Sequence, residues 1–233
     1  MRLTHDIISI ENLEPHAIES MYQLMRYYYD NLHREKFLKD LNEKEGVLLG
    51  HDENGEICGF TTYAIFEIYF KEEKIRILFS GDTVIREEFW GKWSTAKSFI
   101  TLIKKMMECG EPKCYWFLLT KGVRTYQYLP LYFKEYYPSP QFETPDYEKD
   151  LIVQLSRLKF GNCYLEHKGI IRFNPPADRL KEKYLSFKEK MDDPFIQFFM
   201  QKNPGHINGD ELPCLARISI ENLTSISHRW LKS

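Results

Sequence analysis

The stretch that decides the fold is GVLLGHDENGEICGFTTYAIFEIYF (residues 46–70), followed by KIRILFSGDTVI (74–85) and REEFWGKWSTAKSFITLIKKMM (86–107). Apolar runs on both sides of the turn signal DENG (52–55) predict an antiparallel strand pair, and the next apolar run predicts a further strand. Gly81 within that strand predicts a bulge or kink. The apolar spacing after it predicts an amphipathic helix. A strand that feeds a loop at a helix start presents free N–H groups, which predicts an anion-binding site.

The same signals predict the rest of the first half of the chain. Asn12 is expected to cap a helix that has Pro15 in its first turn. The other elements predicted here are a strand over 6–11, a helix over 34–45, a strand over 114–119 and a helix over 124–136.

A proline-rich segment, PSPQFETP (138–145), predicts a boundary, because its three prolines disfavour both helix and strand. We therefore expect a core over residues 1–145 and a mostly helical elaboration over 146–233 that packs on it. The elements predicted in the elaboration are a helix over 146–158, a hairpin around 167–169, helices over 177–191 and 194–202, a strand over 212–220 and a helix over 221–231.

The predicted fold class is α/β, or α+β by a stricter label, with a mixed and mainly antiparallel sheet and helices on both faces. A net charge of −2 and a pI near 6.4 give no electrostatic footprint for nucleic acid. No apolar run approaches about 18 residues, so no membrane span is expected. Five cysteines without a CxxC pair are typical of reduced thiols in a cytoplasmic protein. The sequence does not determine the oligomeric state.

Two motifs carry a resemblance to a known family. In IREEFWGKWST (85–95) an apolar strand end leads into a loop that contains Gly91, and LYFKEYY (131–137) forms a tyrosine-bearing late helix. With the order of predicted elements over residues 1–137, these motifs resemble the GNAT superfamily of N-acetyltransferases. The resemblance implies a sheet that splays between its fourth and fifth strands. It also implies acyl-coenzyme A in the split, with the pyrophosphate on the loop before the next helix.

The resemblance also implies which residues hold the co-substrate, acetyl-CoA or another acyl-CoA, without a metal. Backbone amides of Thr83, Val84 and Ile85 are expected to hold the pantetheine arm. The loop residues expected to face the phosphates are Trp90, Gly91, Lys92, Trp93, Ser94 and Thr95.

Two side chains are the predicted catalytic groups. Tyr132 is the expected general acid for the departing thiolate, with Tyr128 one turn earlier as the substitute. The alternative for Tyr132 is a buried core tyrosine. Asp82, beside Gly81, is the expected acceptor of the amine proton, and the alternative is a polar residue that shapes a turn or bulge. Glu67 on the preceding strand is a weaker candidate.

Two further polar stretches contain candidate functional residues. The loop KGVR (121–124) after the predicted strand either recognises a carboxylate or phosphate or forms a solvated turn. His206, Asp210 and Glu211 are metal-capable types, but their spacing matches no ligand pattern, so we expect the segment to shape a connection.

Three functions follow. The first is a cytoplasmic acyl-CoA-dependent N-acyltransferase for a small amine-bearing molecule. The second is a GNAT-like protein without catalysis that binds a ligand or partner, and the bulky Trp90 and Trp93 in the loop favour it. The third is an N-acyl synthase that uses long-chain acyl donors, with the aromatic-rich strands lining an acyl tunnel.

Overall fold

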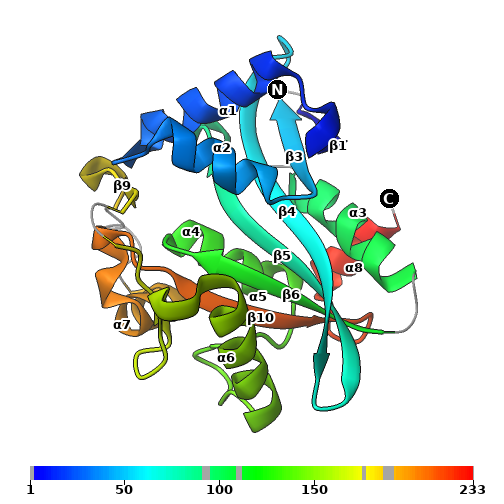
Figure 1. Cartoon of the computed structure of the whole chain (residues 1–233). Helices are drawn as coiled ribbons and strands as arrows, with labels where there is room; N and C mark the ends of the chain where they lie inside the picture. The colour runs from blue at the N-terminus through cyan, green and yellow to red at the C-terminus, as the bar shows by residue number, and fades with distance from the viewer. Residues whose placement is uncertain (1–2, 91–94, 109–111, 175–176, 186–191, 233) are drawn as a thin grey trace.

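The computed structural model describes residues 3–90, 95–108, 112–174, 177–185 and 192–232, and it is built around a six-stranded sheet (Figure 1). The strand order is β1-β3-β4-β5-β6-β10. The strands are β1 (Thr4–Ser9), β3 (Gly46–His51), β4 (Ile57–Phe70), β5 (Glu73–Ile85), β6 (Lys113–Thr120) and β10 (Leu212–Ile218). Only the β5–β6 pair is parallel among these neighbours. The prediction of a mixed, mainly antiparallel sheet is confirmed.

Local turn chemistry sets the long hairpins of this sheet. Between β3 and β4 the Asp52 carboxylate accepts the backbone N–H of Asn54 at 2.9 Å, and Gly55 has φ +80°. Between β4 and β5 the turn places Lys71 and Glu72 at positive φ. These tight turns fix the register of β4 and β5 over most of their length.

Helices cover both faces of the sheet (Figure 1). On one face α3 (Thr95–Glu108), α5 (Tyr128–Tyr132) and α8 (Ser225–Leu231) pack against the strand residues Leu48, Leu78 and Trp116. On the other face α1 (Pro15–Tyr28) and α2 (Arg34–Asn42) cover Val47 and Phe60, and α6 (Asp146–Phe160) covers Ile77 and Phe117. Successive strand residues point to opposite faces, which separates the two sets.

The remaining elements are short. They are β2 (Tyr29–Asp30), α4 (Val123–Tyr126), β7 (Tyr164–Leu165), β8 (Ile170–Ile171), β9 (Arg179–Leu180) and α7 (Pro194–Lys202). The helix predicted over 124–136 is two short helices, α4 and α5, and the chain is extended at Phe133. The hairpin near 167–169 and the helix over 194–202 are confirmed.

Two local predictions are wrong. The helix predicted over 177–191 is replaced, within the described part, by β9 and a 3-10 turn, because Arg179 and Leu180 pair with β2. Tertiary pairing overrides the local helical pattern there. Asn12 does not cap α1: Glu14 precedes the helix, and the Asn12 amide donates to the Ser9 hydroxyl instead.

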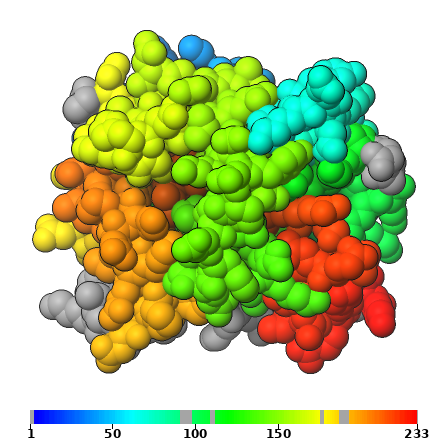
Figure 2. All heavy atoms as spheres, turned by 90° about the horizontal axis from the view of Figure 1, so that it is seen from below, coloured from blue at the N-terminus to red at the C-terminus, as the bar shows by residue number. Residues whose placement is uncertain are grey.

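The segment after residue 145 completes the sheet. Strand β10 pairs with β6 along its whole length, and Thr224, which caps α8, donates from its hydroxyl to the Leu131 carbonyl at 2.7 Å. Seen from below, the orange and red parts of the chain lie on either side of a green to yellow-green part (Figure 2). The boundary placed at 145/146 stays a prediction. Among the described residues, every helix is too short or too polar to cross a membrane.

Candidate active site between strands β5 and β6

The parallel strands β5 and β6 part before β5 ends. Their pairing runs from Ile75 and Lys113 to Ser80 and Leu118, while β5 continues to Ile85. Residues 83–85 pair with β4 on one side only. In the last three residues of β5, the backbone edge that is not paired with β4 therefore faces the space between β5 and β6.

A bulge at this point reverses the faces of β5. Tyr63 of β4 pairs with Ser80, but Thr61, two residues earlier, pairs with Thr83, so β5 carries one extra residue. An extra residue flips every later side chain to the other face. Ser80 and Thr83 consequently share one face, and Asp82 points to the opposite face. The bulge predicted at Gly81 is confirmed.

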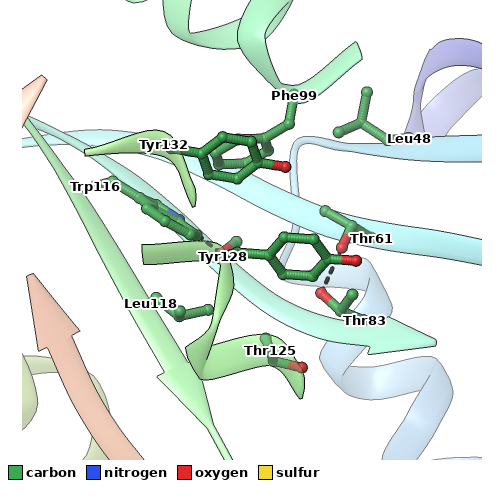
Figure 3. Close-up of a pocket in the computed structure, with 10 residues that line it drawn as sticks. Leu48, Thr61, Thr83, Phe99, Trp116, Leu118, Thr125, Tyr128 and Tyr132 are labelled. Atoms are coloured by element: carbon green, nitrogen blue, oxygen red, sulfur yellow. Dashed lines mark hydrogen bonds between the residues drawn. The ribbon is translucent and has the colours of Figure 1, made fainter. Parts of the chain in front are cut away.

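A narrow cavity opens between the strands on the face covered by α3 and α5 (Figure 3). Its volume is about 30 Å³, which holds about two water molecules. Aromatic rings fill most of the surrounding space. The lining residues are Leu48, Thr61, Ser80, Thr83, Phe99, Trp116, Leu118, Thr125, Tyr128 and Tyr132.

Tyr132 and Tyr128 lie together in this cavity wall. Their rings stack at 5.7 Å between centroids with an interplanar angle of 9°, and Phe99 stacks on the other side of Tyr132 at 5.3 Å. The Tyr128 hydroxyl points toward Thr61 and Thr83 (Figure 3). Burial raises the pKa of the Tyr132 phenol well above its usual range, so it stays protonated and able to donate.

Asp82 lies on the opposite face, at the same gap. Burial, reinforced by the nearby Asp40 carboxylate, raises the pKa of Asp82 to about 7, while Lys121 and Lys44 limit the rise. A carboxylate with a pKa near neutrality accepts and releases a proton readily. The two predicted catalytic residues thus lie on opposite faces of the sheet near the point where β5 and β6 part, and Asp82 is not among the residues that line the cavity.

A buried ionic cluster surrounds Asp82. The Lys121 ammonium at the end of β6 contacts Asp178 and, at 2.8 Å, the Glu211 carboxylate, and its side chain is 10% exposed. Burial alone would lower the pKa of Lys121, but Glu211 and Asp178 raise it well above its usual value. Lys36 of α2 donates to Asp178 at 2.8 Å. Lys121 is thus an ion-paired group and not part of a solvated turn.

The sequence predicted no role for Asp178, and for Lys121 it predicted either recognition of a carboxylate or phosphate or a solvated turn, not these ion pairs within the protein. Strand alternation offers one signal for Lys121, because Tyr115, Phe117 and Leu119 precede it at period two on the face covered by α6. The isolated position of Asp178, in a segment predicted as helix, gave no such signal.

The predicted co-substrate residues are arranged as follows. The Arg86 amide donates to the Cys58 carbonyl at 2.8 Å, so by antiparallel alternation the backbone of Val84 also faces β4. The backbone groups of Thr83 and Ile85 then face the gap. Gly91, Lys92, Trp93 and Ser94 lie outside the described residues, and Thr95 is the first residue of α3.

Trp90 closes the end of β5 from the face of α1. Its indole N–H donates to the Ile85 carbonyl at 2.9 Å, and the Arg124 guanidinium lies 3.6 Å from its ring centre. Tyr28 and Tyr184 pack beside the indole. Trp90 is not among the residues that line the cavity, and Trp93, the other tryptophan that favours the non-catalytic alternative, lies outside the described residues.

The metal-capable residues near the C-terminus have structural partners. The His206 ring contacts the Asn203 carbonyl at 2.9 Å, Asp210 pairs with Arg172, and Glu211 pairs with Lys121. No metal-binding group of three such side chains occurs in the part of the chain that the structure describes. Glu67 is engaged by Lys74 and Arg76.

Solved structures provide the available comparisons, since no protein-family model and no curated protein sequence matches this chain. A probable N-acyltransferase from Enterococcus faecalis V583 is 14% identical, with a TM-score of 0.42, over 57% of this chain and 33% of that one. A GNAT family N-acetyltransferase from Escherichia coli in complex with CoA is 15% identical, with a TM-score of 0.37, over 50% and 63%. Glucosamine-6-phosphate N-acetyltransferase from Arabidopsis thaliana is 18% identical, with a TM-score of 0.34, over 48% and 81%. This chain thus spans less than two thirds of the length of the E. faecalis and E. coli proteins.

Proposed function

We propose that this chain is an acyl-CoA-dependent N-acyltransferase of the GNAT type that acts on a small amine. The observation that carries the proposal is the parting of β5 and β6 after Ser80 and Leu118, with Asp82 on one face of the sheet there and Tyr132 on the other. A donor thioester where the strands part meets a proton acceptor from one face and a proton donor from the other.

In the proposed reaction, Asp82 and Tyr132 carry out the two proton transfers that acyl transfer requires. Asp82 accepts a proton from the ammonium, directly or through water, and the free amine attacks the thioester carbonyl carbon. A C–N bond forms and the C–S bond breaks. Tyr132 protonates the departing thiolate, and the products are an amide and CoA. In this proposal the backbone groups of Thr83 and Ile85 that face the gap bind the pantetheine amides, and the Ile85 carbonyl does so in exchange for the Trp90 indole.

An acyl donor of any length must displace part of the aromatic wall formed by Phe99, Trp116 and Tyr132 when it enters, because a cavity of about 30 Å³ is smaller than an acyl group with its pantetheine arm. The cytoplasmic location and the small-molecule acceptor remain predictions from the sequence.

The test is release of CoA from acetyl-CoA in the presence of a panel of primary amines. We expect Asp82→Asn and Tyr132→Phe each to lower kcat by roughly 10²- to 10⁴-fold, because each removes a proton-transfer group. Asp150→Asn, a surface residue paired with Lys71, is the matched control and should leave kcat unchanged. Full activity in both variants would rule out this mechanism. Absence of acetyl-CoA binding in calorimetry would rule out the proposed function.

A further inference from the structure

The face that carries Asp82 also carries two lysines beside one aromatic ring. The Lys159 ammonium of α6 lies 4.5 Å from the centre of the Phe79 ring, and the Lys44 ammonium lies 5.7 Å from it. Phe79 immediately precedes the bulge. The two cations come from elements on opposite sides of the site, one following α2 and one in α6.

Only one of these two cations has its charge compensated. Lys44 donates to the Asp40 carboxylate at 2.5 Å. Lys159 has ring contacts to Phe66 and Phe79, and among the described residues no carboxylate forms an ion pair with it. Burial, together with the charge of Lys44, lowers the pKa of Lys159, which Glu43 and Asp40 partly offset. A bound anion beside Lys159 would stabilise its charged form and offset the unfavourable burial of the ammonium group.

A buried hydroxyl without a partner lies at the same place. Thr62 of β4 is 1% exposed and its Oγ1 has no hydrogen-bond partner, which is costly for a buried polar atom. A side chain added at Gly81 would place its Cβ 3.5 Å from this oxygen, 3.4 Å from Lys44 Cε and 3.7 Å from the Phe79 ring. The missing side chain of Gly81 thus leaves a notch, next to Asp82, that these three groups border.

We propose that the acceptor amine also carries a carboxylate, which Lys159 binds beside Lys44 and the Thr62 hydroxyl while the amine lies at Asp82. This inference rests on the proposed N-acyltransferase function and names its acceptor class. One uncompensated cation matches a singly charged anion and not a dianion such as phosphate, because Asp40 already neutralises Lys44. The acceptor is therefore an amino acid or a similar zwitterion.

The experiment compares matched primary amines with acetyl-CoA as donor. For each chain length of two to six carbons, the ω-amino acid is compared with its carboxamide. The corresponding aminoalkyl phosphate is the third compound tested. We expect kcat/KM for the carboxylate to exceed that for the carboxamide by about 10-fold or more, which corresponds to about 1.4 kcal/mol. Lys159→Met should bring this ratio close to one, whereas Lys149→Met, an exposed lysine of the same helix, should keep it.

A second readout does not need acyl transfer. The amino acid alone should raise the melting temperature of the wild-type protein and of Lys149→Met, but not of Lys159→Met or of Gly81→Ala, which fills the notch. Transfer without preference for the carboxylate, an unchanged preference in Lys159→Met, or preference for the phosphate would overturn the inference. Binding of the amino acid with this mutant pattern but no transfer would support the site and refute the enzyme.

Discussion

At the scale of single residues, one extra residue in β5 decides the chemistry. Without the bulge, Asp82 would share the face of Ser80 and point toward the apolar wall of Tyr132 and Trp116. With it, Asp82 faces Lys121, Lys44 and other charged groups. Burial then raises the pKa of Asp82 to about 7, which separates its role from that of Tyr132, whose strongly raised pKa keeps the phenol protonated before the reaction.

The pKa of Asp82 predicts a pH dependence of activity. The carboxylate accepts a proton only when ionised, so kcat/KM should rise as pH increases through about 7 and level off above it. A pH–rate profile of the wild type and of Asp82→Asn measures this. The variant should lack the limb near pH 7, and an unchanged limb in the variant would assign it to another group, such as the acceptor amine.

The raised pKa of Asp82 also predicts how stability depends on pH. The folded protein holds the Asp82 proton more tightly than the unfolded chain, whose carboxyl titrates near 4. The free energy of unfolding therefore decreases as pH rises from about 4 to about 7. Asp82→Asn should remove this contribution to the pH dependence. Urea unfolding at pH 5 and pH 8 should show the variant gaining stability relative to wild type at the higher pH.

At the scale of elements, Trp90 connects the end of β5 to the start of α4. Its indole occupies the Ile85 carbonyl, one of the backbone groups that face the gap, while Arg124 of α4 covers the ring. Trp90 is not among the residues that line the cavity. Its indole instead caps the edge of β5, where it binds a backbone carbonyl that the proposed donor would also bind.

This cap predicts the effect of Trp90→Phe. Phenylalanine keeps an aromatic ring beside Tyr28 and Tyr184 but cannot donate to the Ile85 carbonyl. We expect stability to fall by about 0.5–1.5 kcal/mol and the affinity for CoA, measured by calorimetry, to rise several-fold. Weaker CoA binding would instead show that the indole helps to hold the donor.

At the scale of the whole molecule, the Lys121 cluster fastens the last third of the chain to the sheet. Lys121 directly follows β6, whereas Asp178 precedes β9 and Glu211 precedes β10. The C-terminal segment therefore supplies one of the charges that act on the pKa of Asp82, the Asp178 carboxylate. In the proposed acceptor site it also supplies Lys159 of α6.

The cluster predicts a large cost for Lys121→Met. Removing the one cation shared by Asp178 and Glu211 leaves the buried Glu211 carboxylate without its ion pair and Asp178 with Lys36 alone, a loss of roughly 3–5 kcal/mol at pH 8. Urea unfolding measures it, and the loss should shrink at acidic pH as the carboxylates bind protons. Lys113→Met, whose partner Glu73 is on the surface, should cost about 1 kcal/mol or less. Equal costs for the two variants would show that the Lys121 pairs add no more than surface pairs.

The sequence by itself determined the elements and their order around residues 46–107. Strand alternation, the DENG turn, the Gly81 bulge and the amphipathic helix after residue 95 are local patterns, and the fold class followed from them. It also singled out Asp82 and Tyr132, through family resemblance. Local patterns suffice there because turn geometry and side-chain periodicity act over a few residues.

Only the tertiary structure decided how these residues meet. The pairing of β9 with β2 replaced a predicted helix, and the return of β10 to the sheet brought Glu211 to Lys121. The notch at Gly81 joins Thr62, Lys44 and Phe79 from three separate segments. Ion pairs and burial depend on distances between remote parts of the chain, and these distances have no periodic signature in the sequence.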